Sequence, residues 1–171
     1  KIQKIILPLE KKDITNYFAI AILGNVLPFV LITWAEVFIN TNVTGIIMGL
    51  MPIITVFLAY FFVKEEKINV YTFIGILLGF GGLFFLLEIV KNGNNNFFFQ
   101  GAVILAAISF ATATIYTRKI PNFQPIYILT GSTYFAFLML IPLAFIFEDP
   151  LNTSATSQSI ISGIVLGILN T

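Results

Sequence analysis

Five apolar runs of about 20 residues, separated by short polar connections, constrain this chain more than any other feature of its sequence. A helix of that length crosses the hydrocarbon core of a bilayer. The runs lack the strict alternation of a membrane β-barrel. We therefore expect an all-α membrane protein, a polytopic helical bundle. Its expected spans are residues 14–37, 43–63, 70–90, 98–117 and 124–147, followed by a shorter sixth segment at 158–171.

The composition agrees with lipid as the solvent of this surface. Of the 171 residues, 58% are hydrophobic and 10% are charged, whereas soluble domains are about a quarter charged. The net charge of +1 gives no basic field for nucleic acid. The chain holds neither cysteine nor histidine, which excludes thiolate or imidazole metal sites and Ser-His catalytic pairs. We expect no cofactor and no enzymatic activity.

The basic residues predict the orientation, because cytoplasmic loops of membrane proteins carry an excess of Lys and Arg. On these spans, one side holds Lys1, Lys4, Lys11, Lys12, Lys64, Lys67, Arg118 and Lys119, and the other side holds Lys91 alone. We expect the Lys11/Lys12 side to face the cytoplasm, in an inner (plasma) membrane.

The most polar connection, residues 91–96, predicts a boundary between two halves, residues 1–93 and 94–171. Residues 21–28 and 164–171 carry similar apolar sequences on spans of opposite direction, which is typical of an inverted repeat. The chain starts with Lys and stops within an apolar run, so we expect an internal part of a longer protein.

Glycines and prolines within the spans indicate close packing and kinks. The pairs Gly45/Gly49, Gly75/Gly79 and Gly163/Gly167 are spaced four residues apart, as where helix backbones approach closely. We favour packing inside the bundle, with a homodimer seam as the alternative. Pro28, Pro52 and Pro142 each remove a backbone donor. Such broken helices either are packing kinks or border the substrate site of a transporter.

Polar residues inside the spans are the candidates for a binding site. Glu36, beside Trp34, is either an interfacial acid or an acid that faces a water-filled vestibule. Asn25 has several hydrogen-bonding valences to satisfy and precedes Pro28. Asn25, Phe29, Thr33 and Glu36 follow the spacing of one helical face and predict a stripe toward a wet interior. The candidate substrate-binding residues are Asn25, Thr33, Trp34, Glu36, Met48, Thr55, Ser109, Thr112 and Tyr116.

An ordered series of short motifs resembles the EamA-type domain of the drug/metabolite transporter superfamily. The series is Trp34-Ala35-Glu36, Asn42-Val43-Thr44-Gly45, Leu50-Met51-Pro52, Lys64-Glu65-Glu66-Lys67 and Gly75. The family has a Gly where this chain has Glu65. Residues 101–111 with Arg118-Lys119 resemble the first helix of the family's second repeat. The resemblance implies about six spans of a ten-helix inverted-repeat transporter.

By this resemblance, the expected function is secondary transport, as export of small organic metabolites such as amino acids, by alternating access. The implied partners are a small-molecule substrate and the lipid bilayer. Two alternatives remain open. A membrane-embedded enzyme would need an interfacial cluster of acids or a metal site, and a structural or assembly subunit would have no water-accessible cavity.

Overall fold

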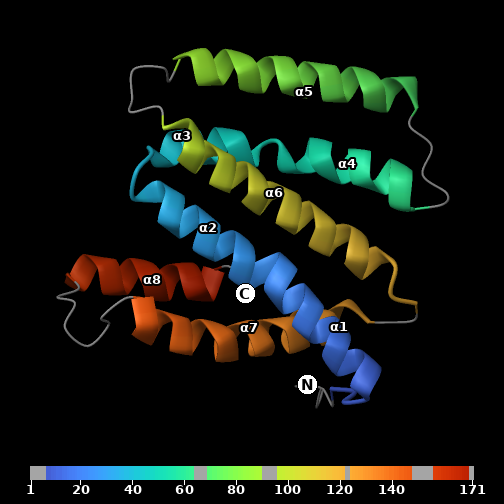
Figure 1. The fold of residues 1–171 in the computed structure, drawn as a ribbon, viewed down its shortest axis with the longest axis vertical. Coiled ribbons are helices and arrows are strands. Elements are labelled where there is room, and N and C mark those ends of the chain that lie inside the picture. The colour runs from blue at the N-terminus through green and yellow to red at the C-terminus, as the bar shows by residue number, and fades with distance from the viewer. Residues whose placement is uncertain (1–6, 64–68, 90–95, 122–123, 148–155, 170–171) are drawn as a thin grey trace. The chain divides into compact units, whose positions relative to one another are not determined.

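The computed structural model describes residues 7–63, 69–89, 96–121, 124–147 and 156–169, and every regular element in these ranges is helical. The elements are α1 (Lys11–Ala21), the π-helical turn η1 (Ile22–Val26), α2 (Leu27–Glu36), α3 (Thr41–Met48), α4 (Met51–Phe62), α5 (Val70–Ile89), α6 (Phe97–Arg118), α7 (Pro125–Phe147) and α8 (Ser157–Leu169). Figure 1 shows their order along the chain. The polar motif at 64–67 and the connection at 91–95 lie outside the described residues.

Within the described ranges, 4 continuous helical stretches are long and apolar enough to cross a membrane: Lys11–Glu36, Thr41–Phe62, Phe97–Arg118 and Pro125–Phe147. They coincide with four of the predicted spans. Helix α5 occupies the position of the predicted third span. The predicted fold class, an all-α polytopic membrane protein, is confirmed.

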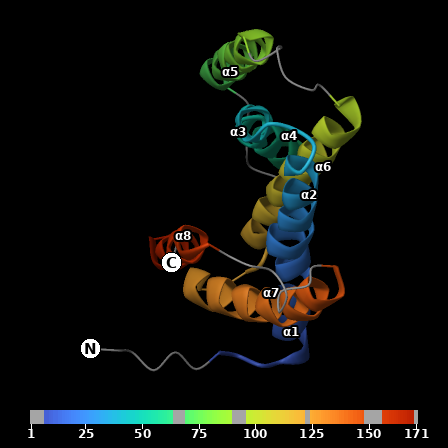
Figure 2. The same ribbon diagram turned by 90° about the vertical axis from the view of Figure 1, so that its left-hand side faces the viewer.

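The first membrane-spanning stretch is a single rod with an irregular centre. Helices α1 and α2 join through η1, and Figure 2 shows the three as one continuous element. In η1 the amide of Leu27 donates to the carbonyl of Ile22, five residues back. This wider turn lies just before Pro28, which is fully buried. The proline therefore coincides with a π-helical turn.

The second membrane-spanning stretch is broken. Helix α3 ends at Met48 and α4 begins at Met51, with Gly49 and Leu50 between them. Pro52 lies in the first turn of α4, where a missing amide hydrogen costs no helical hydrogen bond. The predicted mid-span kink is thus a break between two helices.

Helix α6 packs against most of the first unit's other helices. It contacts α2, α4, α3 and η1 (Figures 1 and 2). Its buried face carries small residues at spacings of four and three, namely Ala102, Ala106, Ser109 and Ala113. Small side chains allow close approach of backbones, and a Cβ placed on Gly24 would lie only 3.2 Å from the Cβ of Ala113. The close approach predicted for glycine pairs is therefore provided here by alanines and Gly24.

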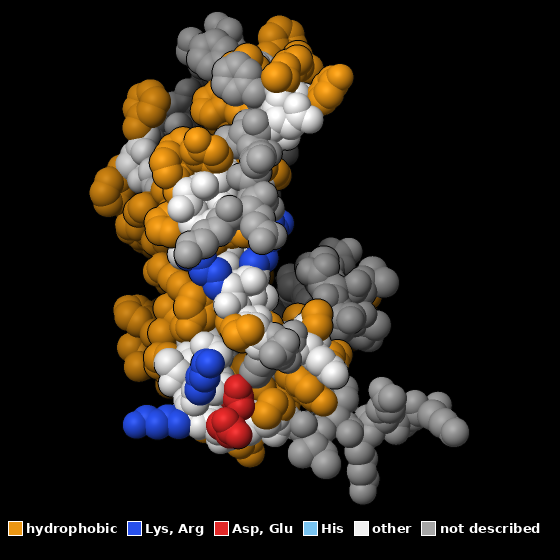
Figure 3. All heavy atoms as spheres, turned by 90° about the vertical axis from the view of Figure 1, so that its right-hand side faces the viewer, with side chains coloured by type: hydrophobic (Ala, Val, Ile, Leu, Met, Phe, Trp, Pro, Cys, Tyr) orange, Lys and Arg blue, Asp and Glu red, His pale blue; other side chains and the backbone are white. Residues whose placement is uncertain are grey.

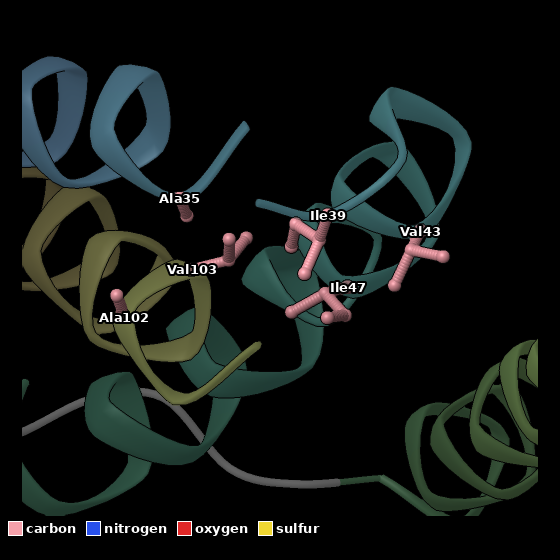
Figure 4. Close-up of a cluster of buried hydrophobic side chains, with 6 residues drawn as sticks. All are labelled: Ala35, Ile39, Val43, Ile47, Ala102 and Val103. Atoms are coloured by element: carbon pink, nitrogen blue, oxygen red, sulfur yellow. The ribbon is translucent and has the colours of Figure 1, made fainter. Parts of the chain in front are cut away.

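One end of this packing is a compact apolar core. Its buried side chains are Ala35, Ile39, Val43, Ile47, Ala102 and Val103, from α2, the following turn, α3 and α6 (Figure 4). Met48 is half-buried against this cluster. The core holds the short α2–α3 turn against the N-terminal part of α6.

The predicted tight packing of the glycine pairs is wrong at several positions. A Cβ added at Gly45, Gly75, Gly82 or Gly163 would meet no atom within 4 Å, and at Gly79 it would make only an ordinary 3.6 Å contact. Gly49, against Leu83, is tight. The tightest position is Gly131, where a Cβ would lie 2.5 Å from the ring of Tyr17. The four-residue spacing did not identify it, because its partner is an aromatic side chain.

The chain forms two compact units, Lys1–Phe137 and Leu138–Thr171. The second unit contains the end of α7 and α8, and α7 continues as a helix through Pro142. The first unit contains the helices with the polar residues discussed below. The predicted division into halves at 93/94 stays a prediction.

Candidate functional site along the α6 packing face

The backbone irregularity in the first span is completed by a side chain from α6. In the π-helical turn, the carbonyl of Leu23 would accept from residue 28, five positions on, but Pro28 has no amide hydrogen. The hydroxyl of Ser109 donates to this carbonyl at 2.7 Å. Ser109 is itself buried. The hydroxyl of Ser109 therefore takes the place of the amide donor that Pro28 cannot supply to the carbonyl of Leu23.

A second polar contact joins α6 to α1 two turns further along. The hydroxyl of Tyr116 donates to Oδ1 of Asn16 at 2.9 Å, and Asn16 is buried. Ser109, Thr112 and Tyr116 are spaced three and four residues apart, on one face of α6. Of the predicted site residues, Ser109 and Tyr116 are thus brought onto the same partner rod.

The three threonines of the predicted site bind their own helices. Thr33 donates to the carbonyl of Phe29, Thr55 to that of Met51, and Thr112 to that of Ile108. A hydroxyl has one hydrogen to donate and two lone pairs. With the hydrogen used, each threonine oxygen can offer only an acceptor to a further group. These side chains suit solutes that carry N–H or O–H donors.

Trp34 belongs to an aromatic group at the end of α2 and the start of α6. Its ring lies edge-on to Phe98 and Phe99, with centroids 5.8 and 5.2 Å away. Phe38 stacks on Phe99 at 4.0 Å. Trp34 is still 44% exposed, so part of its side chain is left for another partner. The structure separates this aromatic group from the polar contacts of Ser109 and Tyr116 along α6.

Asn25 and Glu36 are both half-buried. Neither side chain has a hydrogen bond or ion pair with another residue in the described ranges. Asn25 lies in η1, where the spacing rule of an α-helix does not apply. Phe29, Thr33 and Glu36 keep the spacing of one face on α2, whereas Asn25 is not assigned to that face by periodicity. That this face borders a wet interior stays a prediction.

The start of α1 and the ends of α4 and α6 lie near one another in the first unit. The Asn16–Tyr116 bond joins the start of α1 to the end of α6, and Lys119 lies 5.0 Å over the ring of Phe62 at the end of α4. The basic residues Lys11, Lys12, Arg118 and Lys119 thus share one end of the first unit. In Figure 3, the Lys and Arg side chains of the visible face lie in the middle and lower parts of the view, and the Asp and Glu side chains lie in the lower part.

Sequence reading missed three buried residues at this end. Asp13, Asn16 and Tyr17 share the inward face of α1 with Ile20 and Ala21. Tyr17 seats its ring on Gly131 and lies 6.5 Å from the ring of Phe135 on α7. The signal was present, because polar residues at 13, 16 and 17 have the spacing of one helical face. Asp13 was missed because the predicted span began only at residue 14, whereas Asn16 and Tyr17 lay within that span and were not singled out.

Apolar helices of membrane-spanning length, two of them irregular at a proline and packed on a third, define a polytopic helical membrane protein. The chain belongs to the EamA-like transporter family, which it matches over residues 1–88. The predicted family is therefore confirmed, and it is a family of transporters rather than enzymes.

Curated relatives agree with this family. The chain is 25% identical over 173 residues to the uncharacterized transporter YoaV of Bacillus subtilis, covering 99% of this chain and 59% of the relative. It is 31% identical over 122 residues to the riboflavin transporter ImpX of Fusobacterium nucleatum. This alignment covers 66% of the chain and 40% of the relative. The chain spans about half the length of the curated relatives it matches. No solved structure matches it significantly.

Proposed function

We propose that this protein is a secondary transporter that exports small organic metabolites, such as amino acids, by alternating access. The observation that carries the proposal is the pair of irregular spans, at η1–Pro28 and at Gly49–Leu50, in helices that both pack on α6. Transporters place substrate sites beside discontinuous helices, where backbone groups are not all used within the helix. Family membership supports the same function.

The proposed substrate path follows α6 and the irregular spans. Its residues are Asn25, Thr33, Trp34, Glu36, Met48, Thr55, Ser109, Thr112 and Tyr116. Thr33, Thr55 and Thr112 would act as acceptors, and Glu36 would attract an amine or a hydroxyl donor. Trp34 would offer a flat face for an apolar or cationic group. Ser109 and Tyr116 would hold the backbone and α1 in place beside the path.

A flat, hydroxyl-rich solute is the second candidate substrate. One relative is named a riboflavin transporter. The exposed ring of Trp34 and the acceptor oxygens of the threonines suit such a molecule as well as an amino acid. A transport panel that contains both kinds of solute separates the two.

The organisation and the location complete the proposal. We propose that residues 1–93 and 94–171 belong to two inverted repeats of a longer transporter in the plasma membrane, with Lys11 and Lys12 in the cytoplasm. The clustering of four basic residues at one end of the first unit supports this orientation. A homodimer is the proposed alternative use of the open glycines of α5.

The test uses the full-length protein in liposomes and a panel of labelled amino acids and riboflavin. Glu36→Gln should keep the yield and the gel-filtration profile of the folded protein while reducing transport at least about tenfold, since a lost interaction with a charged group is worth about 1.5–3 kcal/mol. Glu10→Gln, an exposed acid outside the proposed path, is the control and should transport normally. Unchanged transport in the Glu36 variant would contradict a role for this acid.

A further inference from the structure

A buried hydroxyl on α3 has no hydrogen-bond partner. Thr44 is 4% exposed, and its Oγ1 is the one buried side-chain oxygen or nitrogen without a partner among the residues that the structure describes. Such a group costs stability, because it has lost its hydrogen bonds to water and gained none in the protein. A hydroxyl that is kept at this cost calls for a physical reason.

Other threonines show what the hydroxyl of Thr44 lacks. Six of them donate to the carbonyl four residues back in their own helix: Thr15, Thr33, Thr55, Thr112, Thr114 and Thr117. For Thr44 this carbonyl belongs to Asn40, and it already accepts from the amides of Val43 at 2.9 Å and of Thr44 at 3.2 Å. Both lone pairs of that oxygen are therefore engaged. The hydroxyl hydrogen of Thr44 is left free to donate, unlike those of the threonines on the proposed path.

Thr44 lies at the edge of the buried face of α3. Successive residues of an α-helix are turned by about 100°, so Val43 and Ile47 lie to one side of Thr44, where they belong to the apolar core (Figure 4). Met48 and Gly45 lie to the other side. Met48 is half-buried, and a Cβ added at Gly45 would meet no atom within 4 Å. Thr44 thus borders the packed core on one side and open space on the other.

The position of Thr44 along the helices relates it to Glu36. Helix α2 ends at Glu36 and α3 begins at Thr41, so the two residues lie at the same end of the first unit. Thr44 lies in the first turns of α3, before the break at Gly49. An acid on α2 and a free donor on α3 are complementary to the ammonium and the carboxylate of an amino acid, because hydrogen bonds with a charged partner are the strong ones.

We propose that the hydroxyl of Thr44 donates to the carboxylate of a transported amino acid and so contributes to the selection of this class of solute. The proposal rests on the proposed function, and it adds a binding residue to the path. The hydroxyl is shielded from water in this conformation. Alternating access opens the site of a transporter to each side in turn, so a hydroxyl that is closed off in one conformation meets the solute in another.

The first test is the transport of labelled amino acids by the full-length protein in liposomes. Thr44→Val removes the hydroxyl and keeps the branched shape, so KM should rise about tenfold, as for the loss of a hydrogen bond to a charged group. Thr44→Ser keeps the hydroxyl and should have a KM close to that of the wild type. Thr114→Val is the matched control and should transport normally, because the hydroxyl of Thr114 binds the carbonyl of Phe110 in its own helix.

Thermal unfolding in detergent separates binding from a structural role. Because Thr44→Val replaces an unsatisfied hydroxyl by a methyl group, its unfolding midpoint should stay the same or rise by up to about 4 °C. A structural role predicts a lower midpoint together with the loss of transport. A wild-type KM in Thr44→Val, or reduced transport with a lowered midpoint, would overturn the proposal.

The accessibility of Thr44 is measured without any transported solute. In a full-length protein cleared of other cysteines, Thr44→Cys should react with a small water-soluble thiol reagent. Val43→Cys, at a position of the apolar core that is also 4% exposed, should not react. An unreactive Thr44→Cys would exclude the residue from the path even if amino acids are transported. A wild-type protein that transports no amino acid would contradict the proposed function, and the carboxylate assignment with it, before any Thr44 variant is compared.

Discussion

At the scale of single residues, Ser109 forms a hydrogen bond to another helix that its position in the sequence does not predict. A serine within a span commonly binds a carbonyl of its own helix. Ser109 instead donates to Leu23, 86 residues away in the chain. Because the π-helical turn and Pro28 leave this carbonyl without an amide partner, the hydroxyl removes the cost of an unsatisfied buried group.

Ser109→Ala should therefore destabilise the full-length protein by about 1–3 kcal/mol, the cost of an unsatisfied buried acceptor. The matched control is Thr112→Ala, which removes a hydroxyl bonded only to Ile108 of the same helix. Unfolding in detergent by circular dichroism measures both. Equal losses of stability in the two variants would contradict the stabilising role of the hydrogen bond between Ser109 and Leu23.

At the scale of elements, α1 and α7 fit through a glycine and an aromatic ring. The ring of Tyr17 is 1% exposed and occupies the space beside Gly131, where a Cβ would collide with it at 2.5 Å. A rigid aromatic ring cannot yield as the end of a flexible side chain does. The contact therefore fixes the separation of the two helices.

Gly131→Ala should lower the stability of the folded protein by about 1–3 kcal/mol, the usual cost of overpacking. Gly101→Ala is the control, because a Cβ there meets no atom within 4 Å. Alanine at this helical position should be neutral or stabilising by up to about 1 kcal/mol. Thermal unfolding of the two purified variants compares them, and a destabilised Gly101 variant beside an unaffected Gly131 variant would contradict the packing described.

At the scale of the whole molecule, the direction of the helices across the membrane governs which end opens to which compartment. The start of α1 and the end of α6 lie together, and the aromatic group at Trp34 lies at the other end of α2. The excess of basic residues at the first of these ends predicts that it faces the cytoplasm.

Single cysteines test this orientation directly, because the chain has no cysteine of its own. In cells that express a full-length protein cleared of any other cysteine, Val37→Cys should react with a membrane-impermeant thiol reagent added outside. Lys12→Cys and Lys119→Cys should react only after the cells are permeabilised. All three positions are exposed. Labelling of Lys119→Cys in intact cells would reverse the proposed topology.

The sequence by itself determined the class of the protein and the places of its helices. Apolar runs long enough to cross a bilayer must form helices, since no water is present to satisfy the backbone. The predicted segments at 14–37, 98–117 and 124–147 accordingly match the helices of the structure within a few residues. The ordered motifs around Trp34, Pro52 and Gly75 were enough to predict the family.

Only the tertiary structure decided which residues meet. Ser109 and Leu23, Tyr116 and Asn16, and Gly131 and Tyr17 are each far apart in sequence, and each contact depends on how two helices cross. Helical spacing identifies a face but not the neighbour of that face. For this reason the glycines of α5 were wrongly expected to be tight, and the buried Asp13 was overlooked. Their surroundings are set by helix packing, which cannot be predicted position by position from the spacing of residues in a single sequence.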